Sequence, residues 1–587
     1  MSENKNRISE LTTKLYGQSE AFEILDQIYT KLNQFRHQFA QAQADMQVAT
    51  DMTEKDALLI TYGDQFSAPD QTPLESLAVF LNKSLQDVVS GVHILPFFPY
   101  SSDDGFAVID YSEVDPQKGT WQDIADLEDH FKLMFDLVAN HISSQSDWFI
   151  GFLDSKEPYI NYFMVQEPTT NLSSVVRPRA TPILTPFETV DGLKYTWTTF
   201  GVDQIDLNYQ NPQVLLEMID ILLFYVSKGA NFIRLDAIAY LWKIPGTSCI
   251  HLKQTHTVVK LFRAILDEVA EHVLLITETN VPHQENISYF GNYINKQNRT
   301  DEAQLVYQFP LAPLILHTFL TGNASILTQW ANNLPDLNPG TSFFNFTASH
   351  DGIGIRPAEN LLGAQQIQAL VARTLRHGGR VSYKNNSDGT QSAYELNITW
   401  FDALNNIQNL QPKVDVARFL ASQTIMLSLA GVPGIYIHSL FGSRNCLPCV
   451  EETGRYRSIN REKFLLAEIN AELKKENSLK FAVFSGYRKL LAVRKQQPAF
   501  HPAAEQKILS ISEQVFAVLR IAENREIVLC LINVTDQDIK VMIPCDGSGI
   551  PKQGTWKDLL SEEIFPASKT MQVNLLPYQS RWMKLVS

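Results

Sequence analysis

Two carboxylic acids at the ends of apolar segments are the strongest chemical signal in the sequence. Asp236 ends the run Asn231-Phe-Ile-Arg-Leu-Asp236, and Glu278 ends the run Val273-Leu-Leu-Ile-Thr-Glu278. Breaking an acetal bond needs two such groups across the scissile bond, one ionised to attack the sugar carbon and one protonated to donate to the leaving oxygen. We therefore predict that Asp236 is a nucleophile and that Glu278 is a general acid and base.

The local environments of these two groups predict pKa shifts in opposite directions. Alternation along a strand places Arg234 and Asp236 on the same face, and a neighbouring guanidinium lowers the pKa of a carboxyl group. Glu278 ends an apolar strand, where desolvation raises its pKa. A helix N-cap is the alternative for any single carboxylate. Caps do not account for Asp236, Glu278 and Asp351 in order, with His141 and His350 beside them.

Eight short apolar runs, each followed by polar residues and then a helical pattern, predict β/α units with a parallel sheet. The fold class that we expect is a (β/α)8 TIM barrel, because eight such strands fit a closed barrel. Charged residues follow these strands, and in a barrel such positions share the rim that carries the active site. The expected strands are 57–62, 92–98, 133–138, 232–235, 273–277, 304–309, 343–347 and 434–437, and the rim residues are Asp103, His141, Asp236, Glu278, Asp351 and, at longer range, Arg457.

The remaining segments predict additions to this barrel. We expect the barrel to span residues 55–500, with excursions over the rim at about 142–205 and 352–410. Residues 1–54 predict a helical extension of two amphipathic helices, whose apolar positions include Ile8, Leu11, Phe22, Ile28 and Phe35. Short strands after about residue 500 predict a C-terminal β-sandwich domain at 501–587.

Composition excludes several classes of partner. The chain has 587 residues, with Lys+Arg 49 against Asp+Glu 64 and a net charge of −15, which offers no basic field for nucleic acid or for an anionic membrane. The polar N-terminus lacks a secretory signal, so we expect a soluble cytoplasmic protein with reduced thiols. Cys446 and Cys449 have the spacing of a redox pair or of half a zinc site, but nothing completes a metal site. We expect no metal and no cofactor.

Four segments together resemble the signature regions of the α-amylase superfamily of glycoside hydrolases and transglycosylases, and the resemblance covers residues 55–500. They are Asp136-Leu-Val-Ala-Asn-His141, Arg234-Leu-Asp236, Ile276-Thr-Glu278 and Ala348-Ser-His-Asp351. The resemblance implies that Asp236 is the nucleophile, Glu278 the acid/base and Asp351 the carboxylate that distorts the sugar and stabilises an oxocarbenium-like transition state. It also implies that His141, Arg234 and His350 contact these carboxylates or the sugar.

Within that superfamily the sequence is most similar to the sucrose phosphorylase group. The shared motifs are His93-Ile-Leu-Pro-Phe-Phe98, Asp103-Asp-Gly-Phe106, Arg177-Pro-Arg179, Asp203-Gln-Ile-Asp206, Gly246-Thr-Ser-Cys249, His350-Asp-Gly-Ile-Gly354 and Arg457-Ser-Ile-Asn-Arg461. This similarity implies that Asp103 and Arg457 hold distal glucose hydroxyls. It implies that Phe106 and Phe200 offer apolar faces, that Gln204 lines the acceptor side, and that Arg179 and Tyr394 bind phosphate.

An acidic protein needs a local arginine to hold a phosphate dianion, which agrees with the implied roles of Arg179 and Tyr394. The alternatives are that Arg179 is a surface arginine and that Tyr394 is an aromatic residue at the edge of the core.

The reaction that we predict is retaining transfer of α-glucosyl from sucrose to inorganic phosphate, giving α-D-glucose 1-phosphate and fructose. The oligomeric state is not determined by the sequence.

The leaving group has an alternative. Asn280 stands where sucrose phosphorylases often have His. Three motifs resemble the glucosylglycerate phosphorylase branch and its sucrose-specific relatives: Trp242-Lys243, Ile276-Thr-Glu-Thr-Asn-Val-Pro-His283 and Lys384-Asn-Asn-Ser-Asp-Gly-Thr390. A 2-O-α-glucosylglycerate substrate would need a cation at the acceptor site, for which Arg356 and Lys243 are candidates. Two further alternatives are an α-glucosidase or transglucosidase, which would use water or sugar as acceptor, and a non-catalytic sugar-binding protein. Binding alone does not need paired acid and base carboxyls.

Overall fold

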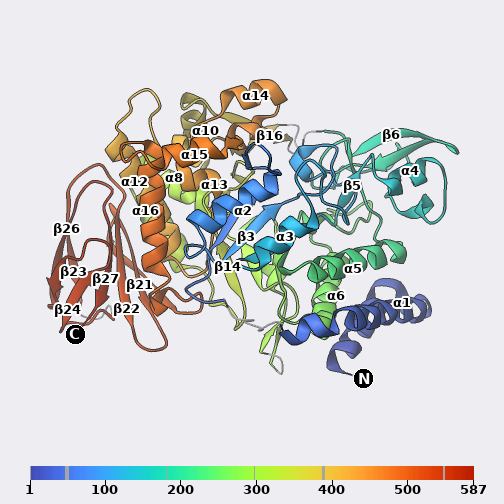
Figure 1. The fold of residues 1–587 in the computed structure, drawn as a ribbon, viewed down its shortest axis with the longest axis horizontal. Helices are drawn as coiled ribbons and strands as arrows, with labels where there is room; N and C mark the ends of the chain where they lie inside the picture. Colours follow the sequence, from blue (N-terminus) through green and yellow to red (C-terminus); the bar gives the residue numbers. More distant parts are fainter. Residues whose placement is uncertain are drawn as a thin grey trace.

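A closed barrel of eight parallel strands forms the centre of the molecule (Figure 1). The computed structural model describes residues 2–45, 52–179, 181–295, 298–385, 390–545 and 549–586. Each strand pairs with its neighbours in chain order, and the last strand closes on the first through the register Leu58 to Gly434. The predicted (β/α)8 fold is confirmed. The barrel strands are β1 (Leu58–Tyr62), β3 (Gly91–Leu95), β4 (Lys132–Leu137), β9 (Ala230–Leu235), β10 (Leu274–Thr277), β13 (Leu305–Tyr307), β14 (Ser342–Asn345) and β18 (Val432–Tyr436).

Helices cover the outside of the barrel, so the strands are buried on both faces, as is usual for parallel sheets. Local sequence sets where several helices begin. The helix α2 starts after Thr72, whose hydroxyl and the Glu75 carboxylate form a capping box, with Pro73 in the first turn. The covering helices include α2 (Pro73–Ser84), α3 (Trp121–Glu128), α5 (Pro212–Ser227), α6 (Lys253–Val269), α8 (Leu311–Thr321), α12 (Pro412–Ser428) and α16 (Leu479–Arg494).

The two long connections predicted to cross the rim contain secondary structure of their own. The first, after β4, includes β5 (His141–Ser143), α4 (Asp147–Leu153), β6 (Leu184–Thr189), β7 (Gly192–Trp197) and β8 (Gln204–Asp206). The second, after β14, includes α10 (Ala364–Arg376), α11 (Trp400–Leu404) and an antiparallel sheet of β15 (Ile353–Gly354), β17 (Gln391–Asn397) and β16 (Arg380–Asn385). Residues 386–389 of the predicted motif 384–390 lie outside the described residues.

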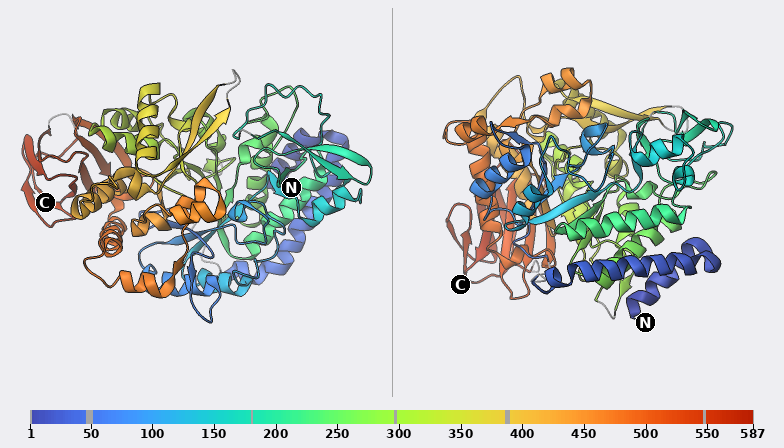
Figure 2. Two further views of the ribbon diagram at one scale, coloured as in Figure 1. Left: turned by 90° about the horizontal axis from the view of Figure 1, so that it is seen from above. Right: turned by 45° about the vertical axis from the view of Figure 1, so that its right-hand side comes forward.

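The N-terminal extension is one helical element, α1 (Glu3–Asp45), broken at Gly17. Gly17 has φ 80°, a conformation that glycine adopts without steric cost, so the element has two helical arms, as predicted. The buried face of the second arm is Ala21, Ile24, Ile28, Leu32 and Phe35. The prediction that Phe22 lies on this face was wrong, because its side chain is 82% exposed. The extension packs beside α5 and α6 (Figure 2), where Arg7 pairs with Asp267 at 2.8 Å.

The C-terminal region is antiparallel β structure, as predicted, and lies beside α12 and α16 (Figure 1). Alternate residues of β21 face two different cores. Val515, Ala517 and Leu519 pack inside the C-terminal region, whereas Phe516 and Val518 join the core of the barrel. The strands are β20 (Glu505–Ser512), β21 (Val515–Ile521), β22 (Ile527–Asn533), β23 (Ile539–Pro544), β24 (Thr555–Asp558), β25 (Ile564–Pro566), β26 (Thr570–Leu575) and β27 (Ser580–Leu585).

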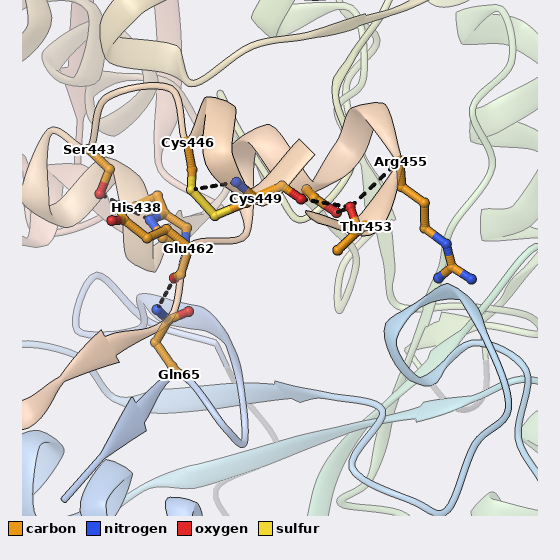
Figure 3. The surroundings of a disulfide bond; sticks show 9 residues. Gln65, His438, Ser443, Cys446, Cys449, Thr453, Arg455 and Glu462 are labelled. Atoms are coloured by element: carbon orange, nitrogen blue, oxygen red, sulfur yellow. Dashed lines mark hydrogen bonds between the residues drawn. A yellow bond between two sulfur atoms is a disulfide. The ribbon is translucent and has the colours of Figure 1, made fainter. Parts of the chain in front are cut away.

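Cys446 and Cys449 form a disulfide at the start of α14 (Leu447–Thr453), as Figure 3 shows. The expectation of reduced thiols was wrong for this pair, because the three-residue spacing brings the two Cα atoms to 5.3 Å. Cys249, Cys530 and Cys545 are buried, and Cys249 and Cys530 are free thiols. In the described part of the chain no helix combines the length and apolar character that crossing a membrane requires.

Candidate active site

A single pocket gathers the side chains predicted from the sequence at the C-terminal ends of the barrel strands. Its empty volume is about 640 Å³, open solvent at its mouth included. All the predicted site residues line it except Arg234, which is buried next to it. The predicted residues that line it are Asp103, Phe106, His141, Arg179, Phe200, Gln204, Asp236, Glu278, His350, Asp351, Tyr394 and Arg457.

Arg234 on β9 lies close to the carboxyl groups of both Asp236 and Glu278. Its side chain is 2% exposed, and its Nη1 atom lies 2.7 Å from Asp236 Oδ1 and also pairs with Asp136. Its Nη2 atom lies 4.0 Å from Glu278 Oε2. Although burial raises the pKa of Asp136, His93 and Arg234 together lower it to about 2. Asp136 is therefore an anion that holds the Arg234 guanidinium in place.

The pKa of Asp236 differs from the prediction. Burial raises it above the usual value for aspartate, while Arg234 opposes that rise and the negative charge of Asp136 adds to it. The predicted effect of Arg234 is present, but desolvation of a carboxyl group at the bottom of the pocket outweighs it. The direct contact with Arg234 still favours the anion, which nucleophilic attack requires.

Glu278 has the environment of a general acid. Burial, followed by the negative charges of Asp236 and Asp351, raises its pKa to about 7 against the opposing effect of Arg234. Its Oε2 atom accepts a hydrogen bond of 3.2 Å from the backbone N–H of Ala237. Ala237 has φ 48°, an uncommon conformation for a non-glycine residue, and it places that N–H beside the carboxyl group. The rise in pKa agrees with the sequence prediction.

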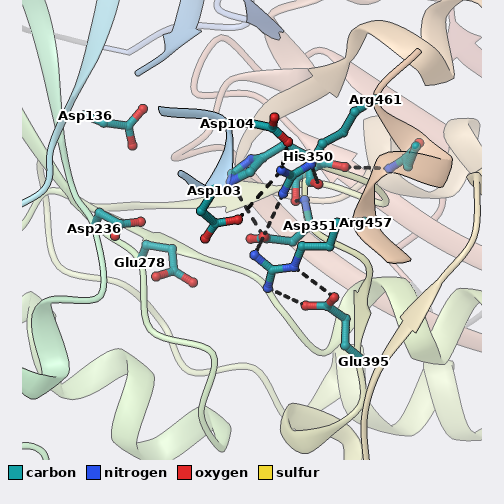
Figure 4. Close-up of polar contacts among 12 residues, drawn as sticks. Asp103, Asp104, Asp136, Asp236, Glu278, His350, Asp351, Glu395, Arg457 and Arg461 are labelled. Atoms are coloured by element: carbon teal, nitrogen blue, oxygen red, sulfur yellow. Dashed lines mark hydrogen bonds and ion pairs between the residues drawn. The ribbon is translucent and has the colours of Figure 1, made fainter. Parts of the chain in front are cut away.

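Arginines surround the third carboxylate, Asp351, as Figure 4 shows. Arg457 Nη1 lies 2.6 Å from Asp351 Oδ1, and Arg461 Nη2 lies 4.0 Å from the same atom. Although burial raises the pKa of Asp351, these guanidinium groups hold it below its usual value. His350, whose Nε2 atom is 3.6 Å from Asp351, is neutral because burial lowers its pKa well below the usual range. The pocket therefore keeps a fixed anion, Asp351, together with Asp236 and Glu278.

The pocket walls are aromatic. The rings of Phe106 and His350 stack with centroids 4.8 Å apart, and Phe200 packs against His141 and against Tyr240 at 5.3 Å each. His141 Nε2 lies 3.0 Å from the carbonyl oxygen of Phe106, which fixes the imidazole against the wall. Flat apolar faces of this kind suit a sugar ring, whose C–H groups need apolar contact while its hydroxyls need polar contact.

Arg179 and Tyr394 come together in the same pocket although they belong to different excursions. The Arg179 guanidinium lies 5.9 Å from the centre of the Tyr394 ring. Tyr240, which the sequence did not single out, lines the pocket beside them. Burial raises the pKa of Tyr240, and the guanidinium groups of Arg356 and Arg179 oppose that rise. This side of the pocket can therefore hold a negatively charged group.

Two further residues that the sequence did not assign complete the rim. Arg461 donates 2.8 Å to the backbone carbonyl of His350 and pairs with Asp104, so it ties the loop after β3 to the loop after β14. Glu395 holds Arg457 through two hydrogen bonds. Both contacts join residues far apart in the chain, and no local pattern in the sequence could have revealed them.

Lys243, one of the two cations considered for a glycerate substrate, contacts other residues outside the pocket. Its Nζ atom lies 2.9 Å from Asp206 Oδ2 and 2.9 Å from Asn140 Oδ1, and its side chain does not line the pocket. Among the residues that the structure describes, no group of three or more His, Cys, Asp or Glu side chains is arranged to hold a metal ion.

Comparison with known families and relatives gives consistent matches. Residues 83–338 match the family model "Alpha amylase, catalytic domain". A glucosylglycerate phosphorylase of Allomeiothermus silvanus is 53% identical over 90% of this chain and 91% of its own length. A glucosylglycerate phosphorylase of Escherichia coli is 42% identical over 99% of this chain and 100% of its own length.

Relatives named for sucrose or for a sucrose phosphate have a lower sequence identity to this chain. The sucrose phosphorylase of Agrobacterium vitis is 30% identical over 76% of this chain and 89% of its own length. Among solved structures, the sucrose 6F-phosphate phosphorylase from Thermoanaerobacter thermosaccharolyticum superimposes with a TM-score of 0.71 at 25% identity, covering 83% of this chain and 95% of that protein.

The assignment of Glu278 predicts how turnover depends on pH. For an α-glucoside whose leaving oxygen needs a proton, kcat/KM should fall about tenfold per pH unit above about pH 7, because the carboxyl group is then ionised. For α-glucosyl fluoride, whose leaving group needs no proton, this decline should be absent. Parallel pH profiles of the two donors measure the difference. Coincident alkaline limbs would show that Glu278 is not the acid.

Proposed function

We propose that this chain, which belongs to the sucrose and glucosylglycerate phosphorylase group of the α-amylase superfamily, cleaves 2-O-α-glucosylglycerate with inorganic phosphate. The chain is a glycosyl-transferring phosphorylase. The products of the proposed reaction are α-glucose 1-phosphate and glycerate. The sucrose reaction predicted first from the sequence takes second place, because the relatives of highest identity named above are glucosylglycerate phosphorylases.

The reaction proceeds in two displacements. Asp236 attacks the anomeric carbon and forms a β-glucosyl ester, while the Glu278 carboxyl group donates its proton to the leaving glyceryl oxygen. Phosphate then attacks the ester from the opposite face. The Glu278 carboxylate takes the proton of the attacking phosphate oxygen, and the Asp236 carboxylate is released, so the product retains the α configuration.

Asp351 and Arg457 act on the donor sugar. The carboxylate of Asp351 is held as an anion by Arg457, and an anion at this position stabilises the positive charge that develops on the sugar ring in the transition state. Asp103 extends the same rim, 3.8 Å from Arg461, where it can accept hydrogen bonds from glucose hydroxyls. The aromatic faces of Phe106 and Phe200 exclude water from the ring.

The observation that carries the proposal is positive charge on the acceptor side of the pocket. Arg179 lines the pocket, and Arg356, which is not among the lining residues, lies close enough to Tyr240 to oppose the rise that burial causes in its pKa. Phosphate is an anion in the second displacement and glycerate carries a carboxylate in the first, so a glucosylglycerate phosphorylase needs positive charge on its acceptor side. Fructose is neutral, so the sucrose reaction needs positive charge for phosphate alone, and the second guanidinium group, Arg356, favours glycerate as the leaving group. Asn280 is also in the pocket, and its buried Oδ1 atom has no hydrogen-bond partner within the described protein, so it can accept from a leaving-group hydroxyl.

A substrate comparison tests the choice of leaving group. Glucose 1-phosphate formation should have the highest kcat/KM with 2-O-α-glucosylglycerate, against sucrose and against 2-O-α-glucosylglycerol, which lacks the carboxylate. Arg356→Ala should lower kcat/KM for glucosylglycerate by about 10- to 150-fold, the usual loss for a charge-assisted contact, with little change for glucosylglycerol. Sucrose as the best substrate, or an equal effect of Arg356→Ala on both glucosides, would overturn the assignment.

A second variant tests the acceptor. Arg179→Ala should reduce the use of phosphate by about 30- to 1000-fold while release of free glucose to water survives, because water needs no counter-charge. Glucose 1-phosphate and glucose are measured across a phosphate titration. Arg177→Ala is the matched control, since Arg177 lies in the same loop and bonds to the carbonyl of Thr181 instead of lining the pocket. Equal losses in both product channels for Arg179→Ala would contradict phosphate binding there.

A further inference from the structure

Glu395 is a buried carboxylate next to the pocket that the reaction above does not use. It lies on β17, directly after Tyr394, and is 1% exposed. Its two oxygens accept hydrogen bonds from Arg457, at 3.1 Å from Nε and 2.7 Å from Nη2. This is the forked geometry in which a carboxylate fixes both the position and the plane of a guanidinium group.

The third nitrogen of the same guanidinium faces the catalytic rim. Nη1 of Arg457 lies 2.6 Å from Asp351 Oδ1, so one arginine bridges Glu395 on one edge and Asp351 on the other, as Figure 4 shows. Because the guanidinium is planar, fixing its Nε and Nη2 atoms also fixes the direction of Nη1. The orientation of the Asp351 contact therefore depends on Glu395.

The backbone beside Glu395 allows the loop that carries Asp351 to lie close to β17. The segment after Asp351 pairs antiparallel with β17, Gly354 opposite Glu395. A Cβ atom on Gly352 would lie 2.4 Å from the carbonyl oxygen of Leu396 and 2.7 Å from Cγ of Glu395. Such distances are not tolerated, so glycine at 352 allows the Asp351 loop to lie against the strand that carries Glu395.

We propose that Glu395 is a positioning residue that aligns Arg457, and through it Asp351, for the donor sugar. Because Tyr394 and Glu395 are adjacent on β17, the same strand also ties the acceptor side of the pocket to the donor side. The inference rests on the proposed function only for the identity of the sugar that Asp351 serves. It adds a residue whose action is transmitted by Arg457, without contact with substrate.

Glu395→Gln is the variant that isolates this effect. Glutamine has nearly the same shape, but its amide nitrogen is a hydrogen-bond donor and would face an N–H donor of Arg457. Only one of the two hydrogen bonds to Arg457 would therefore remain. The expected result is a loss of about 10- to 100-fold in kcat/KM for α-glucosyl fluoride, with weaker inhibition by free glucose. Unchanged kinetics would overturn the proposal.

A double-mutant cycle separates positioning from general support of the fold. Arg457→Lys keeps a charge but removes the fork, so in that background Glu395→Gln should cost less than about twofold. If Glu395→Gln costs the same factor with Arg457 and with Lys at 457, Glu395 does not act through the arginine, and the proposal fails.

Asp558→Asn provides the matched control. Asp558 is a fully buried carboxylate whose Oδ2 lies 3.0 Å from Arg581 Nη1 in the C-terminal sheet, away from the pocket. This change should leave kcat/KM unaltered.

The donor in all these measurements is α-glucosyl fluoride, and the release of fluoride is measured, so the outcome does not depend on which acceptor takes the sugar. Failure of the phosphorylase assignment would appear instead as free glucose with no glucose 1-phosphate in the wild type.

Discussion

One buried positive charge organises the reaction centre. Arg234 is 2% exposed, and burying a guanidinium at that depth is costly unless anions or hydrogen-bond acceptors pair with it. Asp136 supplies a permanent anion, and Asp236 takes the remaining contact at 2.7 Å while Glu278 stays at 4.0 Å. Arg234 opposes the rise in pKa that burial causes at both carboxyl groups, and its closer contact is with Asp236. Burial and the negative charges of Asp236 and Asp351 raise the pKa of Glu278 to about 7, so Glu278 holds a proton up to about that pH.

The barrel makes that arrangement possible, because parallel strands bring residues distant in sequence to a common rim. Arg461 bonds to the loop of His350 and pairs with Asp104, and Arg457 joins Asp351 to the strand that carries Tyr394. These arginines hold separate loops together. The acceptor side is built by the two excursions, which supply Arg179 and Arg356, and the Arg179 guanidinium lies 5.9 Å from the centre of the Tyr394 ring. A donor site held together by ion pairs, beside an acceptor site built from excursions, suits a group of related enzymes with different leaving groups.

Much of the fold and the donor site follows from patterns along the chain. The eight barrel strands are short apolar runs ended by polar residues, and Asp236, Glu278 and Asp351 were recognised because they stand at those ends. Contacts between distant segments were not predictable. Lys243 does not line the pocket because it pairs with Asp206, and the proposed role of Glu395 depends on its ion pair with Arg457. The net pKa shift of Asp236 also required the structure, because the depth of burial decides whether desolvation outweighs a neighbouring arginine.

The most direct test of the account is to identify the residue that becomes covalently glycosylated. A 2-deoxy-2-fluoro-α-glucosyl fluoride carries a fluorine at carbon 2 that destabilises the positive charge of both transition states. Fluoride is a good leaving group that offsets this effect in ester formation, whereas release of the ester stays slow. After digestion, mass spectrometry should find the fluoroglucosyl group on the peptide that contains Asp236, and competing phosphate should release it as the α-phosphate. A label on Glu278 or Asp351, or release as the β-phosphate, would contradict the assignment of Asp236 as the nucleophile of a retaining reaction.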